Sequence, residues 1–223
     1  HDIRLHIFPF EREIDMIKTI FDYINKYRPW FTLSWNAEFD DNYLVNRMSY
    51  LGYDPADIMI PPEFITRKIY YQENRDPNVQ PENSKDWFFC STYTQFMCQM
   101  KNYALTRKSQ QKKRSMKLTD IGRDEAGITK LNVESESSFR EAAYINLIKF
   151  LLYNVRDVVV QVAIDASTMD AASFYARSYN FCTQYSKCFQ ETHIVRNSRE
   201  YYFELDGFVQ ACALEVDKNA DSH

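Results

Sequence analysis

Glycine is scarce in this sequence, with only four in 223 residues. Loops that cradle phosphates, such as G-x-G-x-x-G or the Walker A sequence, need several closely spaced glycines. Neither pattern occurs here. The sequence therefore argues against dinucleotide binding and against binding of nucleoside triphosphates through a P-loop.

Cysteine and histidine are too scattered to suggest a disulfide framework or a zinc site. The five cysteines are odd in number and show no C-x-x-C spacing, and the four histidines lie far apart. This usage predicts buried, reduced thiols in a cytosolic protein. The expected location is the cytoplasm, or the host-cell cytoplasm if the protein is viral.

Long apolar runs and a surplus of positive charge are also missing. No apolar run approaches the ~20 residues needed to span a bilayer, and the first residues show no signal-peptide pattern, so no membrane partner is expected. The formal net charge is −4, whereas proteins that coat DNA by long-range attraction are usually basic. An enzyme that gathers carboxylates around metal ions and keeps its basic residues local fits this charge better.

Aromatic residues are abundant, with 16 Phe, 16 Tyr and 3 Trp. Together with a hydrophobic content of 45% they can form a sizeable core. A few of these rings could instead stack on unpaired bases.

The N-terminal part of the chain alternates between strand and helix patterns. Apolar residues at helical spacing predict a helix over Glu11–Tyr27, which Pro29 ends. Leu5–Phe8 and Trp30–Trp35 are typical of strands, and the second reads as buried on both faces. A short turn then leads into a helix from about Asp40 to Leu51. This order favours an α/β fold in which helices pack on a sheet.

The remaining segments are assigned in the same way. Residues 52–85 are rich in Pro, Asp and Asn and predict a long loop with short pieces of structure. Trp87–Thr92 reads as a strand, and helices are predicted over Tyr93–Leu105, Leu118–Ala126 and Ala171–Ser186. Phe139–Met169 reads as one long helix or two abutting ones. The end, Tyr201–Leu214, reads as strand-like around an Asp206–Gly207 turn.

An acidic cluster follows the second predicted strand, in the sequence W-N-A-E-F-D-D-N-Y-L-V-N-R of Trp35–Arg47. The spacing puts Asp40 at the start of the next helix. Free backbone N–H groups and the positive helix end stabilise a carboxylate there, and its oxygens can also face a metal ion. The alternative is that Asp40 or Asp41 only caps the helix.

A second cluster lies in Tyr153–Asp157, within a strongly apolar helical segment. Tyr153 and Asp157 are four residues apart, so they share one face of the helix. A carboxylate in apolar surroundings needs a partner, because a lone buried charge is costly. That partner is either a metal ion or an Arg or Lys side chain.

Together these segments resemble the exonuclease motifs of family B DNA polymerases. Trp35–Arg47 is similar to the second motif (W-N, an acidic residue, F-D, two residues, Y-L, two residues, R), and Tyr153–Asp157 to the third, Y-x-x-x-D. Between them, Ser115–Lys130 resembles the family's S-x-x-L-x-x-I followed by a short acidic helix and G-x-x-K. The similarity covers roughly Leu5–Asp165 and is clearest to the polymerases of large tailed bacteriophages.

The resemblance implies a ribonuclease H-like exonuclease fold, with a mixed sheet flanked by helices and incomplete at the N-terminus. It also implies a two-metal 3′→5′ proofreading exonuclease of the DEDDy type. Asp40 and Asp157 would be metal ligands for two Mg²⁺ or Mn²⁺ ions, which take oxygen ligands. Tyr153 would orient the attacking water, and Asn36 would lie near the 3′-terminal nucleotides.

The resemblance also implies a domain division and partners. The exonuclease domain would cover residues 1–170, and residues 171–223 would form a link toward the polymerase palm. The expected partners are the single-stranded 3′ end of DNA and the remainder of the polymerase polypeptide, and a sliding clamp is a further candidate.

A basic run lies between the second and third motif-like segments. Its members are Arg107, Lys108, Lys112, Lys113, Arg114 and Lys117. Lys112, Lys113 and Arg114 are the candidates for phosphate contacts with the single-stranded 3′ end, which local positive charge favours. The alternative is a solvated loop.

The sequence departs from the family pattern at the first motif. Such exonucleases carry a D-x-E pair on the first strand of the sheet, and none occurs among the 39 residues before Asp40. We expect the chain to be a fragment that is inactive alone. The alternatives are that a second chain supplies the missing strands, or that the chain is an inactive module that only binds nucleic acid. A chance match in a structural protein is a third hypothesis. The polymerase signatures are absent as well, so the polymerase active site is not in this chain.

Overall fold

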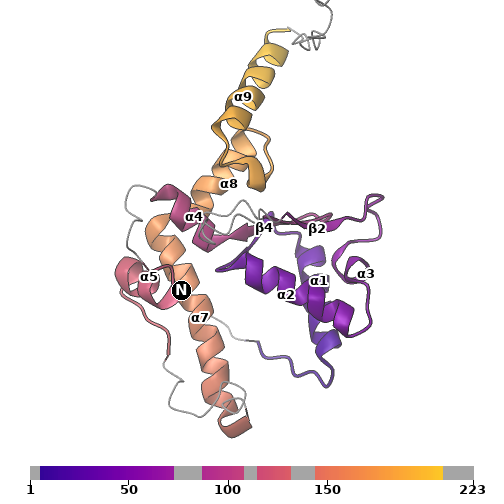
Figure 1. Ribbon diagram of the computed structural model, residues 1–223, viewed down its shortest axis with the longest axis vertical. Helices are drawn as coiled ribbons and strands as arrows, with labels where there is room; N and C mark the ends of the chain where they lie inside the picture. The colour runs from indigo at the N-terminus through magenta and orange to yellow at the C-terminus, as the bar shows by residue number, and fades with distance from the viewer. Residues whose placement is uncertain (1–5, 73–86, 108–114, 132–143, 208–223) are drawn as a thin grey trace, which may run out of the picture. The chain divides into compact units, whose positions relative to one another are not determined.

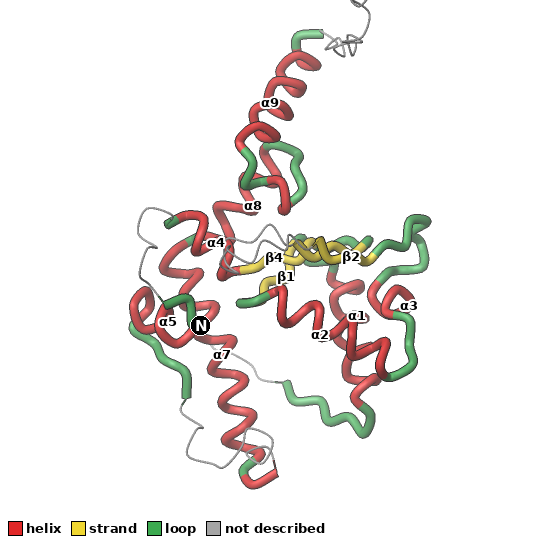
Figure 2. Tube along the Cα trace, viewed as in Figure 1, coloured by secondary structure: helices red, strands yellow, loops and turns green. Residues whose placement is uncertain are grey.

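The computed structural model describes residues 6–72, 87–107, 115–131 and 144–207. The chain forms two compact units, His1–Tyr175 and Ala176–His223. The first unit contains both strand pairs and most of the helices, which confirms the predicted α/β class. Figures 1 and 2 show the helices and the short strands.

The described elements follow one another in a fixed order along the chain. They are α1 (Glu13–Tyr27), β1 (Phe31–Ser34), α2 (Ala37–Tyr50), α3 (Pro55–Met59), β2 (Ile69–Gln72), β3 (Trp87–Cys90), β4 (Gln95–Cys98), α4 (Gln99–Thr106), α5 (Leu118–Ala126), α7 (Leu147–Thr168), α8 (Asp170–Asn180), the 3₁₀ helix η3 (Tyr185–Lys187) and α9 (Glu191–Leu205).

Helix α1 confirms the prediction made from its apolar spacing. Ile14, Ile17 and Phe21 recur at helical intervals and are buried. The helix ends at Arg28, whose backbone is left-handed and whose N–H donates to the carbonyl of Ile24 at 2.8 Å. Pro29 follows directly, so the helix cannot continue.

The described strands form two pairs instead of one continuous sheet. β1 and β4 run parallel, with Phe31 opposite Gln95 and Ser34 opposite Cys98. β2 and β3 are antiparallel. The predicted helix over Tyr93–Leu105 is therefore wrong in its first half, because Gln95–Cys98 pairs with β1 and the helix begins only at Gln99.

Strand β1 is less buried than its aromatic sequence predicted. Leu33 is 36% exposed and the preceding Trp30 is 56% exposed. Burial on both faces was therefore the wrong interpretation of Trp30–Trp35. In the described part of the chain the strand is half-buried beside β4.

The predicted strands at the two ends of the chain are also wrong where the structure describes them. Residues 6–10 have no regular structure, and Leu5 lies outside the described residues. Tyr201–Leu205 belongs to helix α9. Gly207, two residues after the helix, has a left-handed backbone with φ 74°. The rest of that prediction, residues 208–214, lies outside the described residues.

Of the predicted helical stretch Phe139–Met169, residues 144 and 145 are helical, and α7 follows from Leu147 after a break at Asn146. Residues 139–143 lie outside the described residues, and the side chain of Asn146 caps α7 by accepting from the N–H of Lys149 at 3.0 Å. The helix ends at Met169, which adopts a left-handed backbone with φ 56°. Ala171–Ser186 is likewise divided, because α8 ends at Asn180 and a turn precedes η3.

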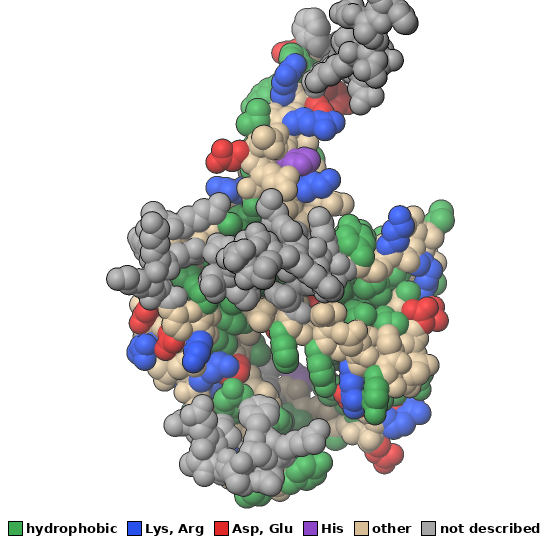
Figure 3. Space-filling view, viewed as in Figure 1, with side chains coloured by type: hydrophobic (Ala, Val, Ile, Leu, Met, Phe, Trp, Pro, Cys, Tyr) green, Lys and Arg blue, Asp and Glu red, His purple; other side chains and the backbone are tan. Residues whose placement is uncertain are grey.

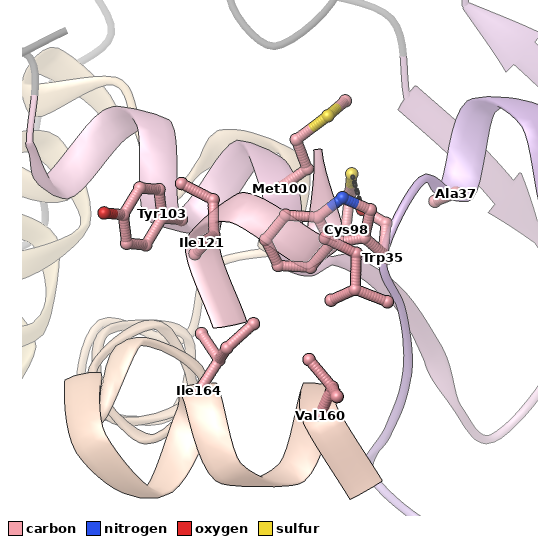
Figure 4. Packing of buried hydrophobic residues seen from close by; sticks show 9 residues of the cluster. Trp35, Ala37, Cys98, Met100, Tyr103, Ile121, Val160 and Ile164 are labelled. Carbon is pink, nitrogen blue, oxygen red and sulfur yellow. Dashed lines mark hydrogen bonds between the residues drawn. The ribbon is translucent and has the colours of Figure 1, made fainter. Parts of the chain in front are cut away.

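Two clusters of buried residues hold the first unit together. One lies between α1, α2, α3 and β3 and includes Ile17, Met48 and Met59. The other joins the end of β1 to α4, α5 and α7; Figure 4 shows Val160 and Ile164 of α7 pointing toward Trp35 and Ile121. The indole N–H of Trp35 also donates to the carbonyl of Met116 at 3.2 Å. This second cluster packs α7 against the start of the Trp35–Arg47 segment, which contains the other acidic motif.

In the part of the chain that the structure describes, no helix is long and apolar enough to cross a membrane.

Candidate active site

The register of α7 places Tyr153 and Asp157 on its packed side. Val160 and Ile164 are buried in the second cluster, and Asp157 and Tyr153 precede Val160 by three and seven residues. These spacings keep all four residues on one stripe of the helix. Burial of the two apolar residues therefore turns the predicted catalytic pair toward the segment that follows α5.

Lys130 lies in that segment and contacts both residues. Its Nζ is 2.8 Å from Oδ2 of Asp157 and 3.5 Å from the hydroxyl oxygen of Tyr153. The side chains of Lys130 and Asp157 are 26% and 22% exposed, so the ion pair is largely shielded from solvent. The pairing that the helical Tyr–Asp spacing left open is thus filled by a lysine in this structure.

The ion pair also changes the protonation of Lys130. Burial lowers the pKa of its ammonium group, but the hydrogen bond to Asp157, the charge of Asp157 and Tyr153 together raise the pKa above its ordinary value. Lys130 is therefore a stable cation at neutral pH.

The segment that contains Lys130 is fixed where it leaves α5. Gly127 adopts a left-handed backbone with φ 65° and ends the helix. The N–H of Ile128 then donates to the carbonyl of Gly122 at 3.0 Å. On the other side, Nε of Arg156 donates to the carbonyl of Thr129 at 2.9 Å. Lys130 therefore extends from a backbone that is held both by α5 and by α7.

Asp40 lies one turn inside α2, not at its start as the sequence predicted. The helix begins after Asn36, and the N–H of Asp40 already donates to the carbonyl of Asn36 at 2.9 Å. Burial raises the pKa of the Asp40 carboxyl, while a hydrogen bond with the Asn36 backbone and the charge of Lys130 lower it in part. Asp40 and Asp157 are therefore both within electrostatic reach of the same ammonium group.

Asp41 points into the protein and is not the helix cap considered from the sequence. It is 8% exposed, and its Oδ2 accepts no hydrogen bond from any residue that the structure describes. Burial, followed by the charge of Asp40, raises its pKa to about 7. The capping interpretation is also wrong for Asp40, because Asn36 is the N-cap residue and its side chain makes no capping hydrogen bond.

Asn36 lies at the junction of β1 and α2, beside the acidic residues. Its backbone carbonyl accepts from Phe39 and Asp40, whereas its side-chain Oδ1 is buried and accepts no hydrogen bond within the described ranges. The predicted DNA-contacting residues Lys112, Lys113 and Arg114 lie outside the described residues. At the start of the same basic run, Arg107 pairs with Asp170 at 2.8 Å.

Two aromatic rings flank Asp40 on α2. Phe39 and Tyr43 are 66% and 53% exposed, and their rings stack with a centroid separation of 6.2 Å. Figure 3 shows hydrophobic side chains standing out from the surface over and beside α2. Composition alone does not single out these rings, although their spacing of four residues around Asp40 is the signal that finds them.

The acidic residues fit part of a site for hard divalent ions. Carboxylate oxygens are the ligands that such ions prefer, and Oδ1 of Asp157 is buried without a hydrogen-bond donor among the described residues. However, those same residues contain no group of three or more His, Cys, Asp or Glu side chains that could hold a metal ion. Asp40 and Asp157 can therefore contribute ligands, but they do not form a complete metal site.

Besides the rings of Phe39 and Tyr43, sequence reasoning missed two charged residues of this site. Lys130 is the last residue of the G-x-x-K pattern, but the pattern alone does not indicate a role for it. Arg156 gives no signal in the sequence, because an arginine on a helix normally faces solvent and its contact with Thr129 depends on the tertiary packing of α5 on α7.

Comparison with known proteins agrees with the motif-like segments. A search of curated proteins finds no match. A sequence model of the exonuclease domain of family B DNA polymerases matches residues 2–121, which is more than half of the chain and includes Asn36, Asp40 and Asp41. Tyr153 and Asp157 lie beyond the matched region. The chain therefore belongs to the family B DNA polymerase exonuclease domains.

Proposed function

We propose that this chain is the ribonuclease H-like 3′→5′ proofreading exonuclease domain of a family B DNA polymerase, similar to those of large tailed bacteriophages. The proposed reaction is two-metal hydrolysis of the 3′-terminal phosphodiester of DNA, of the DEDDy type. The exonuclease domain would cover residues 1–170, and residues 171–223 would lead toward the polymerase palm. The observation that carries the proposal is the shared electrostatic environment of Asp40 and Asp157 around Lys130.

Each of these residues would have its own role in the reaction. Asp40 and Asp157 would hold the ions, together with a D-x-E pair that this chain lacks. Divalent ions bound there would activate a water molecule and stabilise the leaving oxygen of the phosphodiester. The hydroxyl of Tyr153 would orient the attacking water. Lys130, which is cationic at neutral pH, would leave Asp157 when the ions bind and would then be available to a substrate phosphate.

The test uses Asp157→Asn in the intact polypeptide that carries this chain. This change keeps the size of the side chain but removes its charge. We expect metal-dependent 3′→5′ digestion of single-stranded DNA to fall more than about 100-fold, because metal-assisted charge stabilisation supplies several kcal/mol and each 1.36 kcal/mol is tenfold in rate. The rate is followed by gel analysis of an end-labelled oligonucleotide with Mg²⁺ or Mn²⁺.

Asp22→Asn is the matched control, because Asp22 is an exposed carboxylate on α1. It should digest DNA at the rate of the unsubstituted protein. Full activity in Asp157→Asn would refute the assignment. Binding of DNA without digestion by the unsubstituted polypeptide would instead favour an inactive binding module, the alternative that the ion pair between Lys130 and Asp157 supports.

The exposed rings on α2 supply the binding part of the proposal. Stacking on an aromatic ring contributes about 1–3 kcal/mol per base and tolerates any sequence. Phe39 and Tyr43 are exposed beside Asp40, so the proposal places unpaired 3′ bases on them. Phe39→Ala is expected to weaken binding of a single-stranded oligonucleotide about 5- to 150-fold, measured by fluorescence anisotropy.

Tyr50→Ala is the control for Phe39→Ala. Tyr50 lies on the same helix and is 79% exposed, but it is three turns away from Phe39. Its replacement should leave DNA affinity within about twofold of the original value, since it would lose only scattered surface contacts. Equal losses in the two variants would mean that the rings near Asp40 have no special role.

A further inference from the structure

Three residues of one short stretch of α7 hold Lys130 in place. Asp157 and Tyr153 contact its ammonium group, and Arg156 binds the carbonyl of Thr129 through Nε at 2.9 Å. The carbonyl of Thr129 belongs to the same peptide group as the backbone nitrogen of Lys130. The chain is therefore fixed at both the base and the tip of the lysine side chain.

The adjacency of Arg156 and Asp157 makes this arrangement specific. Neighbouring residues on an α-helix point about 100° apart, so one faces the backbone of the Gly127–Leu131 segment while the other meets the end of the Lys130 side chain. A lysine has a flexible four-carbon stem that carries a point charge. The position of its ammonium group therefore depends strongly on where its backbone starts.

The start of the Gly127–Leu131 segment also packs closely against α5 and α7. A Cβ atom built on Gly122 would lie 2.5 Å from Cγ1 of Val160 and 2.7 Å from the carbonyl oxygen of Ile128. The absence of a side chain at Gly122 therefore allows α5, α7 and the start of the segment to come together. Arg156 then fixes the carbonyl of Thr129, the next one along the chain.

We propose that Arg156 is a positioning residue, which sets the ammonium group of Lys130 against Asp157 by binding the carbonyl of Thr129. Its catalytic consequence rests on the proposed exonuclease function, whereas the placement of Lys130 does not. In the proposed reaction, Arg156 would not touch the DNA, the water or the metal ions. It would act only through the lysine.

The placement is tested by a double-mutant cycle on thermal unfolding of the full chain. The variants are Arg156→Met, Lys130→Met and both together, and methionine keeps an unbranched stem without a donor. If Arg156 positions Lys130, removing either residue disables the same contacts, so the drop in melting temperature of the double variant is smaller than the sum of the two single drops. Arg156→Lys replaces Arg156→Met should the latter fail to unfold cooperatively.

The matched control cycle uses Arg123→Met in place of Arg156→Met. Arg123 is 60% exposed on α5 and its guanidinium contacts Asp120 and Asp124. Its effect should add to that of Lys130→Met, since the ion pairs that the two side chains form within the described residues involve different carboxylates. If the Arg156 cycle is as additive as the Arg123 cycle, the proposal is overturned, whether or not the protein digests DNA.

The catalytic consequence is measured in the intact polypeptide that carries this chain. Arg156→Met should lower kcat about tenfold, the effect expected of one charge-assisted hydrogen bond, and leave KM for a single-stranded oligonucleotide unchanged. Arg156→Lys should recover part of kcat, because it retains a cationic donor. An unchanged kcat in Arg156→Met would overturn the positioning role in the reaction. An unsubstituted protein without any digestion would refute the proposed function, and the unfolding cycle would still decide the placement.

Discussion

Asp41 is a carboxyl group enclosed by the fold, and it makes stability depend on pH. Its pKa in the folded protein is raised to about 7 by burial and by Asp40, against about 3.9 in an unfolded chain. Between these values the folded protein keeps a proton that the unfolded chain releases. The free energy of unfolding therefore decreases as pH rises from about 4 to about 7, by up to the order of 4 kcal/mol at about 1.4 kcal/mol per unit.

Asp41→Asn should remove this dependence. The amide cannot ionise, so we expect the variant to be more stable than the original protein near pH 8 and similar to it near pH 4. Urea denaturation at pH 4 and pH 8 gives the two free energies, and Asp22→Asn serves as the surface control. An equal change in the free energy of unfolding between the two pH values for Asp41→Asn and the original protein would contradict the prediction.

At the residue scale, the sequence could suggest Asp157 but not its partner. A carboxylate in apolar surroundings had to be paired, and the choice between a metal ion and a basic residue depends on which segment packs against α7. That packing brings Lys130 from 27 residues away in the sequence. The sequence also could not predict that Asp41 points inward, where burial and the charge of Asp40 raise its pKa. The local spacing does not tell which side of α2 is covered by the rest of the protein.

At the element scale, α5 and α7 pack too closely to leave room for a side chain at Gly122. Gly122→Ala would bring a Cβ atom to 2.5 Å from Val160 and 2.7 Å from the Ile128 carbonyl, so the helices must separate. Overpacking of this kind costs about 1–3 kcal/mol, which exceeds the gain of up to about 1 kcal/mol in helix propensity. We expect a net loss in the free energy of unfolding, measured in urea.

Gly52→Ala is an informative comparison for Gly122→Ala. No atom of the described residues lies within 4 Å of a Cβ built on Gly52, but the backbone φ of Gly52 is 84°. Its replacement should cost about 1–2 kcal/mol from backbone conformation alone, without disturbing the methyl resonances of Val160. Gly122→Ala should shift those resonances, and unchanged Val160 signals would show that the helices had not moved apart.

Elements with a strong apolar period were predictable, and those defined by partners were not. The sequence predicts a helix over Leu118–Ala126 with the same bounds that α5 has. Strand β4 was missed because Gln95–Cys98 has helical neighbours in sequence, and only its pairing with β1 makes it a strand. The C-terminal half of α9 was mistaken for a strand because Tyr and Phe favour strands. That preference comes from packing on a half-buried sheet surface, whereas no residue of α9, which is described along its whole length, is buried.

At the scale of the whole molecule, stability should differ between the two units. In the first unit, Val160 and Ile164 of α7 are fully buried. In the second, α9 has no buried residue. Amide hydrogens of α9 should therefore exchange with deuterium by local opening, at least about 100-fold faster than those around Val160, which exchange only with global unfolding.

Hydrogen exchange followed by mass spectrometry checks this prediction with peptides from the same digest. The peptide over Ile17–Phe21 provides an internal reference, since it belongs to the other buried cluster of the first unit. Similar protection in α9 and around Val160 would mean that α9 is covered in solution by something that stabilises it.

The fold class and the acidic motifs followed from sequence order, but the site as a whole did not. Asp40, Tyr153 and Asp157 were chosen from spacing and resemblance, and the described structure adds Lys130, Arg156 and the rings of Phe39 and Tyr43. The contacts of Lys130 and Arg156 depend on how α7 packs against α5. Such information is carried by pairs of distant residues and not by any single segment.

The ion pair of Lys130 with Asp157 means that the chain supplies its own counter-ion. In a solution without divalent ions, the carboxylate of Asp157 is still paired with a positive charge. It therefore does not destabilise the fold as an unpaired buried charge would. In the proposed reaction, a divalent ion would have to compete with the ammonium group of Lys130 for Asp157, so half-occupancy would require a higher ion concentration than at an unpaired carboxylate. Once such an ion had left, Lys130 could pair with Asp157 again, because both residues belong to the same chain.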